Sequence, residues 1–260
     1  MEREQVVHDR RRQRRLEFEG AVNFRDMGGY PAGPGRQTRW HTLYRADSLA
    51  DLTEGDLDRL QALGLRTLID FRLPEERRAK PDRLPDGHTI AIIEPGFVPA
   101  GTLEMLRLVR AGTIEPAEIE RRVIAQYRLF GIDHLVEYRR VMEAAVQQES
   151  YPLLLHCTSG KDRTGFGVAI LMLAVGVPMA AVLEDYDLTN QYRRAVPQLF
   201  GPGTPETVVR ILLSAQAKYL EAAIDEMEQA FGSFDAYLAK GLGVDDAARA
   251  RLAELLTESV

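Results

Sequence analysis

The chain has 260 residues, of which 45% are hydrophobic and 28% are charged, and its formal net charge is −6. This length suits a single α/β core and leaves too little chain for two domains of comfortable size. The negative charge gives no general reason to expect nucleic-acid binding, and no apolar run is long enough to form an integral membrane segment.

The N-terminal residues 1–15 are rich in arginine and are predicted to form a polar arm ahead of a single domain, residues 16–260. We favour a solvated, frayed helix for this arm over a surface that binds anionic lipid or phosphorylated partners. No apolar stretch follows the arginines, so the pattern differs from that of a secretory signal. The single cysteine suits a reducing compartment. We therefore expect a cytoplasmic protein, with export that needs no signal peptide left open.

The first half of the chain is predicted to alternate short strands with turns and helices. Four strands are expected, at Leu16–Phe18, Thr42–Arg45, Leu65–Arg72 and His88–Glu94. The first two strands are separated by the motif Asn23-Phe-Arg-Asp-Met-Gly-Gly29, which turns on its two glycines. A helix is expected from Thr53, because Thr53 and Asp56 can form a capping box, and Gly64 is placed to end it. A further helix begins near Leu73.

The second half of the chain is predicted to be mainly helical. Residues 95–131 form a helical insertion punctuated by glycines and prolines, with short helices near Leu103–Arg110 and Ala117–Phe130. The later helices are expected at Asp133–Gln148, Met179–Arg194, Pro205–Ala230, Phe234–Leu238 and Asp245–Leu256. The pattern in Pro205–Ala230 is amphipathic throughout, which predicts one long helix with a buried face.

The segment Tyr151–Gly167 has an order of elements that is typical of an anion-binding site. The apolar run Leu153–Leu155 predicts a buried strand, and an apolar helical pattern begins at Thr164. His156, Cys157 and a glycine-containing loop lie between the strand and the helix. The first N–H groups of a helix have no partner within the helix, so such a loop can surround an anion with backbone donors.

The loop also carries one thiol and one guanidinium, five residues apart. A thiol at a helix N-terminus beside cations readily becomes a thiolate, so Cys157 is a candidate nucleophile. Arg163 can bind two phosphate oxygens, while backbone amides of the loop bind others. The predicted phosphate cradle consists of Thr158, Ser159, Gly160, Lys161, Asp162, Arg163 and Thr164. The Thr164 hydroxyl is placed to hold the thiolate or to help its release.

The sequence His-Cys-x5-Arg-Thr-Gly resembles the signature loop of cysteine-dependent protein tyrosine phosphatases. The full His-Cys-Thr-Ser-Gly-Lys-Asp-Arg-Thr-Gly, together with the motif at Asn23–Gly29, is similar to a narrower group, the atypical bacterial tyrosine and phosphoinositide phosphatases. The resemblance covers the chain from about Leu16 to its C-terminus. It implies an α/β fold with a central, mainly parallel sheet flanked by helices. It also suggests that residues 95–131 cover the catalytic mouth as a lid; an ordinary packed insertion is the alternative.

The resemblance implies a reaction in two steps without metal or cofactor. Cys157 would attack phosphorus and form a phosphocysteine, which water then hydrolyses, while Arg163 stabilises the equatorial oxygens. The leaving group needs a proton. The Trp-Pro-Asp loop that supplies it in ordinary tyrosine phosphatases is absent, because the only tryptophan, Trp40, precedes a histidine. Asp162 is our first candidate for the general acid and Asp70 the second, with Glu94 and Asp187 as remoter choices.

Three further residues are expected to support the catalytic loop from behind. Arg25 and Asp26 belong to the upstream motif and would brace the floor of the site by hydrogen bonds; a purely structural turn is the alternative. His156 precedes the nucleophile and would hold backbone carbonyls. It is not needed as a base, because a thiolate attacks without one.

The substrate is predicted to be phosphotyrosine on proteins, with phosphoinositides or mixed specificity as the alternative. Lys161 is an additional cation in the loop, and lipid phosphatases that remove inositol 3-phosphates have lysine at the same offset. Thr158, however, is neutral where those enzymes carry lysine. From another class, a non-catalytic phosphate-binding module would keep Arg163 but not the nucleophile. The oligomeric state is left open.

Overall fold

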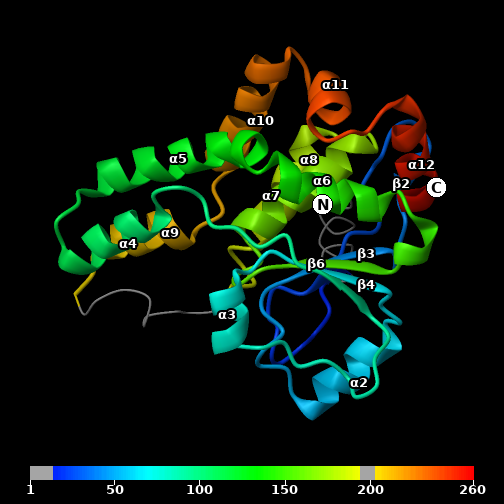
Figure 1. Ribbon diagram of the computed structural model, residues 1–260, viewed down its shortest axis with the longest axis horizontal. Coiled ribbons are helices and arrows are strands. Elements are labelled where there is room, and N and C mark those ends of the chain that lie inside the picture. The colour runs from blue at the N-terminus through cyan, green and yellow to red at the C-terminus, as the bar shows by residue number, and fades with distance from the viewer. Residues whose placement is uncertain (1–13, 194–202) are drawn as a thin grey trace, which may run out of the picture.

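The computed structural model describes residues 14–193 and 203–260, so most of the predicted N-terminal arm lies outside the described residues. Its centre is a five-stranded sheet in the order β1-β3-β6-β4-β5 (Figure 1). The strands are β1 (Arg25–Asp26), β3 (Leu43–Ala46), β6 (Leu153–His156), β4 (Thr67–Asp70) and β5 (Ala91–Ile93). Only β1 runs antiparallel to its neighbour, and the other pairs are parallel.

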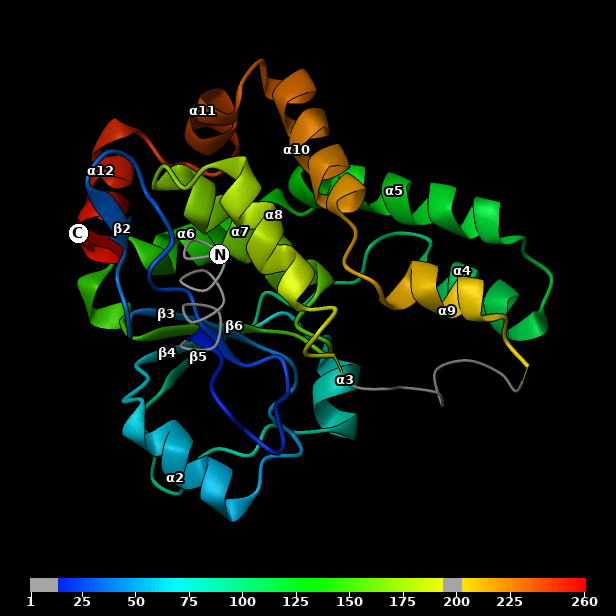
Figure 2. The ribbon, with the colours of Figure 1, turned by 180° about the vertical axis from the view of Figure 1, so that it is seen from behind.

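Helices cover both faces of this sheet. On one side lie α2 (Glu54–Ala62) and, near the strand ends, α3 (Pro74–Ala79) (Figures 1 and 2). On the other side lie α6 (Leu135–Ala145), α7 (Asp162–Ala174), α8 (Met179–Leu188) and α10 (Ala217–Phe231). This arrangement confirms the predicted α/β fold with a mainly parallel central sheet flanked by helices. Thr53 caps α2 in the predicted capping box with Asp56.

The carboxyl ends of three parallel strands meet at one edge of the sheet. His156 at the end of β6 is paired with Ala46 at the end of β3 and with Asp70 at the end of β4. All three strands are fully buried, so their ends are held in a fixed register. Since ligands bind beyond the carboxyl ends of parallel strands, this edge is where the site should lie.

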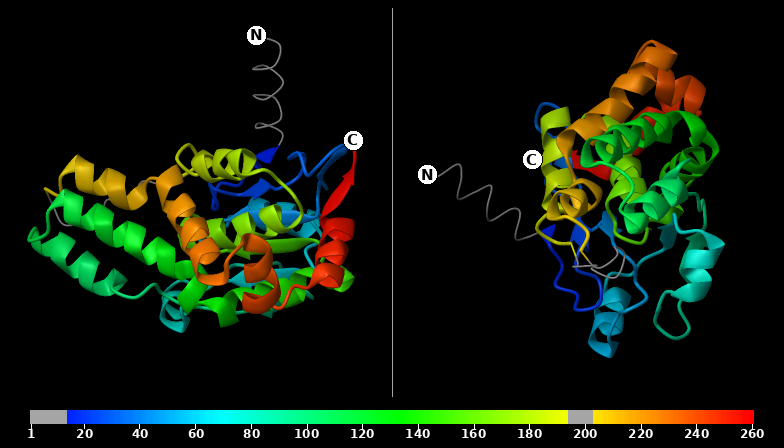
Figure 3. Two further views of the ribbon diagram at one scale, coloured as in Figure 1. Left: turned by 90° about the horizontal axis from the view of Figure 1, so that it is seen from above. Right: turned by 90° about the vertical axis from the view of Figure 1, so that its left-hand side faces the viewer.

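A helical arm projects to one side of the sheet, and we use this name for α4 (Thr102–Ala111), α5 (Pro116–Asp133) and α9 (Glu206–Leu213). Figure 3 shows these helices, green and yellow, extending beyond the strands. The two helices predicted within residues 95–131 are therefore present. The base of the arm packs on α10, where the rings of Tyr127 and Tyr219 lie 5.5 Å apart. The role of the insertion as a lid stays a prediction.

Two secondary-structure predictions are wrong, and a third is too long: the helix predicted at Met179–Arg194 ends at Leu188, and Arg194 lies outside the described residues. Leu16–Phe18 is not a strand. The predicted helix Pro205–Ala230 is two helices, α9 and α10, because the chain breaks at Ser214–Gln216. The Asn190 side chain accepts a hydrogen bond from the Ala215 N–H at 2.8 Å and donates one to the Ala215 carbonyl at 2.9 Å. Both backbone groups are thus satisfied outside a helix, and that makes the break stable.

The C-terminal region adds a feature that the sequence pattern did not predict. After α11 (Phe234–Ala236), a π-helical turn (Tyr237–Gly241) and α12 (Asp246–Leu256), the chain ends in strand β7 (Thr257–Ser259). This strand pairs with β2 (Arg36–Thr38) in a small antiparallel sheet. A short 3-10 turn (Gln148–Ser150) precedes β6. In the part of the chain that the structure describes, no helix is both long and apolar enough to cross a membrane.

Candidate active site

The segment that we call the catalytic loop, residues 157–163, runs from the end of β6 into the first turn of α7. Cys157 directly follows the strand and is only 1% exposed. Helix α7 begins at Asp162, two residues before the predicted start at Thr164, so Asp162 and Arg163 occupy its first turn. Gly160 adopts a positive φ of +65°, and a Cβ there would lie 2.4 Å from the carbonyl oxygen of Ala46. Only glycine fits this position.

Four residues around the mouth of the loop accept hydrogen bonds from Arg163. Its Nη1 donates to the carbonyl oxygens of Phe71 at 2.8 Å and of Phe97 at 3.0 Å. Glu76 on α3 accepts from both ends of the guanidinium, at 2.8 Å from Nη1 and 3.0 Å from Nη2. Nη2 also contacts the Thr158 hydroxyl at 3.3 Å. Nε makes no hydrogen bond within the described residues, so one edge of the guanidinium is left for a ligand.

Glu76 is a member of the site that the sequence pattern did not single out. Burial raises the pKa of its carboxyl group, but the hydrogen bonds and charge of Arg163, with a hydrogen bond from Thr158, lower it to about 2. The carboxylate also accepts from the Leu73 N–H at 2.8 Å, which fixes it at the start of α3. The sequence shows Glu76 only as one of two acidic residues at the start of a predicted helix, which gives no sign of its contact with Arg163.

Lys161 and Asp162 both face the helical arm. The Lys161 ammonium donates to the carbonyl oxygen of Leu212 on α9 at 2.5 Å and lies 3.3 Å from Oδ1 of Asp162. The same Oδ1 accepts a hydrogen bond from the Tyr127 hydroxyl at 2.5 Å. Lys161 is 4% exposed, whereas the Asp162 side chain is 35% exposed. Lys161 is therefore bound to protein groups, and Asp162 has Oδ2 left for other contacts.

The remaining predicted cradle residues differ in exposure. Thr158 and Ser159 are exposed at the mouth, and Gly160 is buried against β3. Thr164 is fully buried, and its hydroxyl has no hydrogen-bond partner in the described part of the chain. The structure thus records no bond from Thr164 to the nucleophile, and the predicted role in holding the thiolate stays untested.

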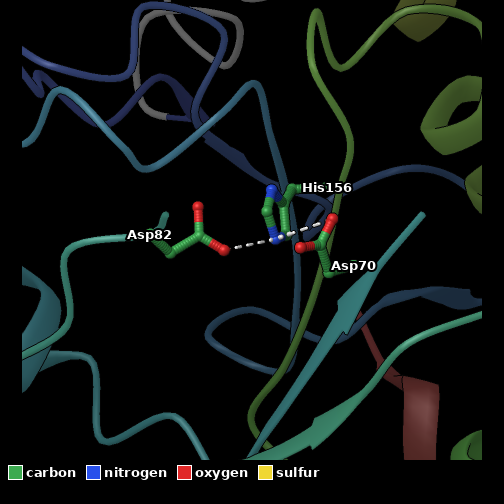
Figure 4. Close-up of side chains that lie close together, drawn as sticks. All are labelled: Asp70, Asp82 and His156. Atoms are coloured by element: carbon green, nitrogen blue, oxygen red, sulfur yellow. Dashed lines mark ion pairs between the residues drawn. The ribbon is translucent and has the colours of Figure 1, made fainter. Parts of the chain in front are cut away.

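His156, which precedes Cys157 in the chain, and Asp70 belong to a buried charged cluster with Asp82 (Figure 4). Nε2 of His156 lies 3.3 Å from Oδ2 of Asp82 and 3.6 Å from Oδ1 of Asp70. Neither ring nitrogen makes a hydrogen bond, so the expected bonds to backbone carbonyls are not seen. Asp70 is bound by Arg72, which donates from Nε at 2.9 Å and from Nη2 at 2.8 Å. Asp70 is 1% exposed, which makes it a poorer acid candidate than Asp162.

The same cluster is the one group that could offer metal ligands among residues 14–193 and 203–260. Asp70, Asp82 and His156 each present a ligand atom, all within 4.8 Å of one another. Arg72 already binds both carboxylates, with Nη2 2.5 Å from Oδ2 of Asp82. The charge of Arg72 therefore already compensates both carboxylates, and the cluster is best explained as an internal ion-pair network.

Arg25 takes part in a second buried network beneath the loop. Its Nε donates to Oδ1 of Asp185 on α8 at 2.8 Å, and Arg45 donates to Oδ2 of the same carboxylate at 2.5 Å. Tyr30 donates to Asp185 as well, at 3.1 Å. Burial alone would raise the pKa of Asp185, but the charges of Arg25 and Arg45 hold it far below its usual range. Arg25 is thus connected to the loop through Asp185 and Arg45, which donates to the Gly160 carbonyl, and its role as a brace stays a prediction.

Asp26 stabilises the turn of the upstream motif. It accepts hydrogen bonds from the N–H groups of Gly28 and His41, each at 2.8 Å. Gly28 and Gly29 pack directly against Trp40, where any Cβ would come within 2.6 Å of its ring. These contacts fit the structural-turn alternative for Asp26. Arg14 packs 3.6 Å from the ring centroid of Tyr30, so the end of the basic segment is built into the fold.

This chain is similar to known proteins along most of its length. A model described as "Tyrosine phosphatase family" matches residues 16–258. A Cupriavidus necator protein that bears the name tyrosine-protein phosphatase is 32% identical over 88% of this chain and 85% of its own length. The triple specificity protein phosphatase PtpB of Mycobacterium tuberculosis is 27% identical over 92% of this chain and 98% of its own. A Nostoc commune tyrosine-protein phosphatase is 27% identical over 78% of this chain and 69% of its own length.

Proposed function

Because this chain belongs to the tyrosine phosphatase family, we propose that it removes phosphate from phosphotyrosine on proteins through a phosphocysteine intermediate. The phosphatase activity follows from the family. The protein substrate, the covalent intermediate and membership of the atypical bacterial group are the proposed steps.

One observation supports the proposal: the thiol of Cys157 and the guanidinium of Arg163 lie at the two ends of one loop between β6 and α7. Cys157 directly follows the buried strand β6, and Arg163 lies six residues further, in the first turn of α7. The Nε edge of its guanidinium is free among the described residues, and Glu76 binds the opposite edge. A guanidinium fixed in this way is aligned before the substrate arrives, which is how a site stabilises the charge of a transition state. A phosphate-binding module without catalysis would not require Cys157.

Asp162 is the proposed general acid. It lies in the first turn of α7 next to Arg163, and its side chain reaches solvent. Oδ1 is bound by Tyr127 and Lys161, so Oδ2 is the oxygen that would deliver a proton to the leaving group. The carboxylates of Asp70 and Glu76 are engaged by arginines, which supports this choice.

The contacts of Lys161 favour phosphotyrosine over a phosphoinositide. A cation that reads a neighbouring phosphate must face the ligand, but Lys161 is buried and directed to α9. Reading a second phosphate would require this ammonium to leave the Leu212 carbonyl and Asp162. A phosphotyrosine has one phosphate and makes no such demand.

The test is phosphate release by the purified full chain from a phosphotyrosine peptide and from a panel of phosphoinositides. We expect turnover of the peptide and none by the Cys157→Ser variant. Equal or faster turnover of a phosphoinositide would replace the proposed substrate with the lipid alternative. Tight binding of both substrates without turnover would identify a phosphate-binding module instead.

A further inference from the structure

Three consecutive carbonyl groups of the catalytic loop are held by one segment of the chain. The Thr158 oxygen accepts from the Ser48 N–H at 3.2 Å, and the Ser159 oxygen accepts from Nδ2 of Asn23 at 3.1 Å. The Gly160 oxygen accepts from Nη2 of Arg45 at 2.5 Å. These donors come from the upstream motif and the end of β3, so all three carbonyls point to the same side of the loop.

The geometry of the peptide bond then fixes the direction of three N–H groups. In a planar trans peptide, the N–H of the next residue points opposite to the carbonyl. The N–H groups of Ser159, Gly160 and Lys161 therefore point away from the Asn23–Ser48 segment. None of the three donates a hydrogen bond within residues 14–193 and 203–260. Three adjacent unpaired donors aimed in one direction form an anion-binding concavity.

The two side chains that hold this arrangement are themselves immobilised. Asn23 is fully buried, and its Oδ1 accepts from Nη1 of Arg25 at 2.5 Å. Its own N–H donates to Asp47 at 3.0 Å. Arg45 is 1% exposed and is anchored by Asp185. Buried donors with fixed partners do not need to reorganise when an anion binds, which is the condition for strong preorganised binding.

We propose that Asn23 and Arg45 are positioning residues that aim the N–H groups of Ser159, Gly160 and Lys161 at the phosphoryl oxygens. This proposal deepens the proposed function and rests on it. It also gives the upstream motif a role beyond that of a turn: its first residue sets the backbone of the phosphate cradle.

The experiment measures the affinity of inorganic tungstate for the full chain by calorimetry, in a Cys157→Ser background. Arg45→Met removes the donor to Gly160 but leaves the Arg25–Asp185 pair intact. We expect about tenfold weaker binding, less than the loss of a whole oxyanion donor. Arg249→Met is a surface control: Arg249 also bridges a carboxylate (Asp235) and a backbone carbonyl (Ala174), at the other end of α7, but its side chain is 37% exposed.

Asn23→Leu distinguishes an effect of N–H orientation from an effect of net charge. It removes the donor to the Ser159 carbonyl without changing the net charge. Weaker tungstate binding by both variants, with Arg249→Met unchanged, supports the proposal. If either variant binds tungstate with an affinity within twofold of the parent, the aiming role of the substituted residue is overturned. Unfolding midpoints are measured alongside, because a folded variant with reduced affinity excludes a merely structural effect.

A second measurement needs no variant. Tungstate added to the ¹⁵N-labelled Cys157→Ser protein should move the amide signals of residues 159–161 more than those of other loops, and unmoved signals would overturn the proposal. A failure of the aiming proposal can be distinguished from a failure of the proposed function. Turnover of the phosphotyrosine peptide with unmoved amides removes only the aiming role, whereas absence of turnover by the intact protein removes the function itself.

Discussion

The catalytic loop is held from two sides by contacts of different kinds. On the side of the upstream motif, Asn23, Arg45 and Ser48 bond backbone carbonyls, and the side chains of the first two are buried. On the side of the helical arm and α3, the contacts are made to the side chains of Lys161, Asp162 and Arg163. One side therefore fixes the shape of the loop, and the other side fixes its charged groups.

Because of this difference, we expect substitutions on the two sides to affect different properties, stability on the inner side and catalysis on the arm side. Buried ion pairs and carbonyl bonds cannot be replaced by water, so changes on the inner side should unfold the protein or distort the cradle. Lys161 and Tyr127 on the arm side are buried, but the two carboxylates there are partly exposed, Asp162 at 35% and Glu76 at 31%. Solvent can substitute for a lost contact there, and we expect changes in turnover with smaller losses of stability.

The largest effect is expected for Asp185→Asn on the inner side. This change leaves Arg25 and Arg45 without their shared carboxylate, at a cost of about 3–5 kcal/mol for a broken buried pair. The surface pair Asp235–Arg249 gives the matched control, and Asp235→Asn should cost less than about 1 kcal/mol. Urea unfolding measures both. Similar small losses would show that the inner side is no more rigid than the surface.

The pH dependence of Asp185 has a definite sign. Its pKa is depressed in the folded protein, so its contribution to stability is present above its unfolded pKa and is lost as pH falls through the folded value. Acid unfolding of the parent should therefore be steeper than that of Asp185→Asn, which lacks this titration.

The next effect is expected for Asp162→Asn on the arm side. If Asp162 protonates the leaving group, the substitution should lower kcat about 10²-fold for an alkyl phosphate and little for nitrophenyl phosphate, whose leaving group needs no proton. The unfolding midpoint should change little. Equal losses with both substrates would remove Asp162 from the acid role and make it a brace between α5 and the loop.

The sequence predicted the local structure of the candidate site better than the distant residues that hold it. The strand, the glycine-containing loop and the helix around Cys157 and Arg163 could be predicted because they follow one another within a short stretch. The α/β fold with a mainly parallel sheet was implied by the family resemblance of the two motifs. These inferences depend on neighbours within a short stretch, which periodicity and motif spacing describe directly.

The supporting contacts could not be predicted because they join distant parts of the chain. Glu76 meets Arg163 across 87 residues, and Arg25 meets Asp185 across 160. The break between α9 and α10 depends on the Asn190 side chain, which satisfies the backbone of Ala215. The small sheet of β2 and β7 pairs residues near opposite ends of the chain. No local pattern encodes such partners. The helical periodicity therefore predicted one long helix where the structure has α9 and α10.

A smaller effect is expected for Glu76→Gln. The amide keeps the volume but loses the charge that orients Arg163, so we expect about a tenfold rise in KM with a smaller change in kcat. The carboxyl pKa of about 2 adds a second readout. Its contribution to stability is present above the ordinary glutamate pKa of about 4.3 and is lost as pH falls toward 2. A lower KM would instead show that Glu76 competes with the substrate for Arg163.

The smallest effect is expected for Tyr127→Phe, which tests the contact between the helical arm and the loop. The substitution removes the hydrogen bond to Oδ1 of Asp162 and keeps the buried ring. One hydrogen bond is worth about 0.5–1.5 kcal/mol, so kcat should fall about two- to tenfold. Steady-state kinetics with the phosphotyrosine peptide measures this loss.

Tyr186→Phe is the matched control for that contact, because the Tyr186 hydroxyl bonds Tyr127 but not Asp162. If Tyr127 acts by holding Asp162, Tyr127→Phe should lower kcat more than Tyr186→Phe, and the difference should disappear in an Asp162→Asn background. Equal losses in both single variants would mean that the tyrosine pair only packs α5 against α8. The arm would then contribute to stability in the same way as the inner side, and the division between shape and charge would not hold.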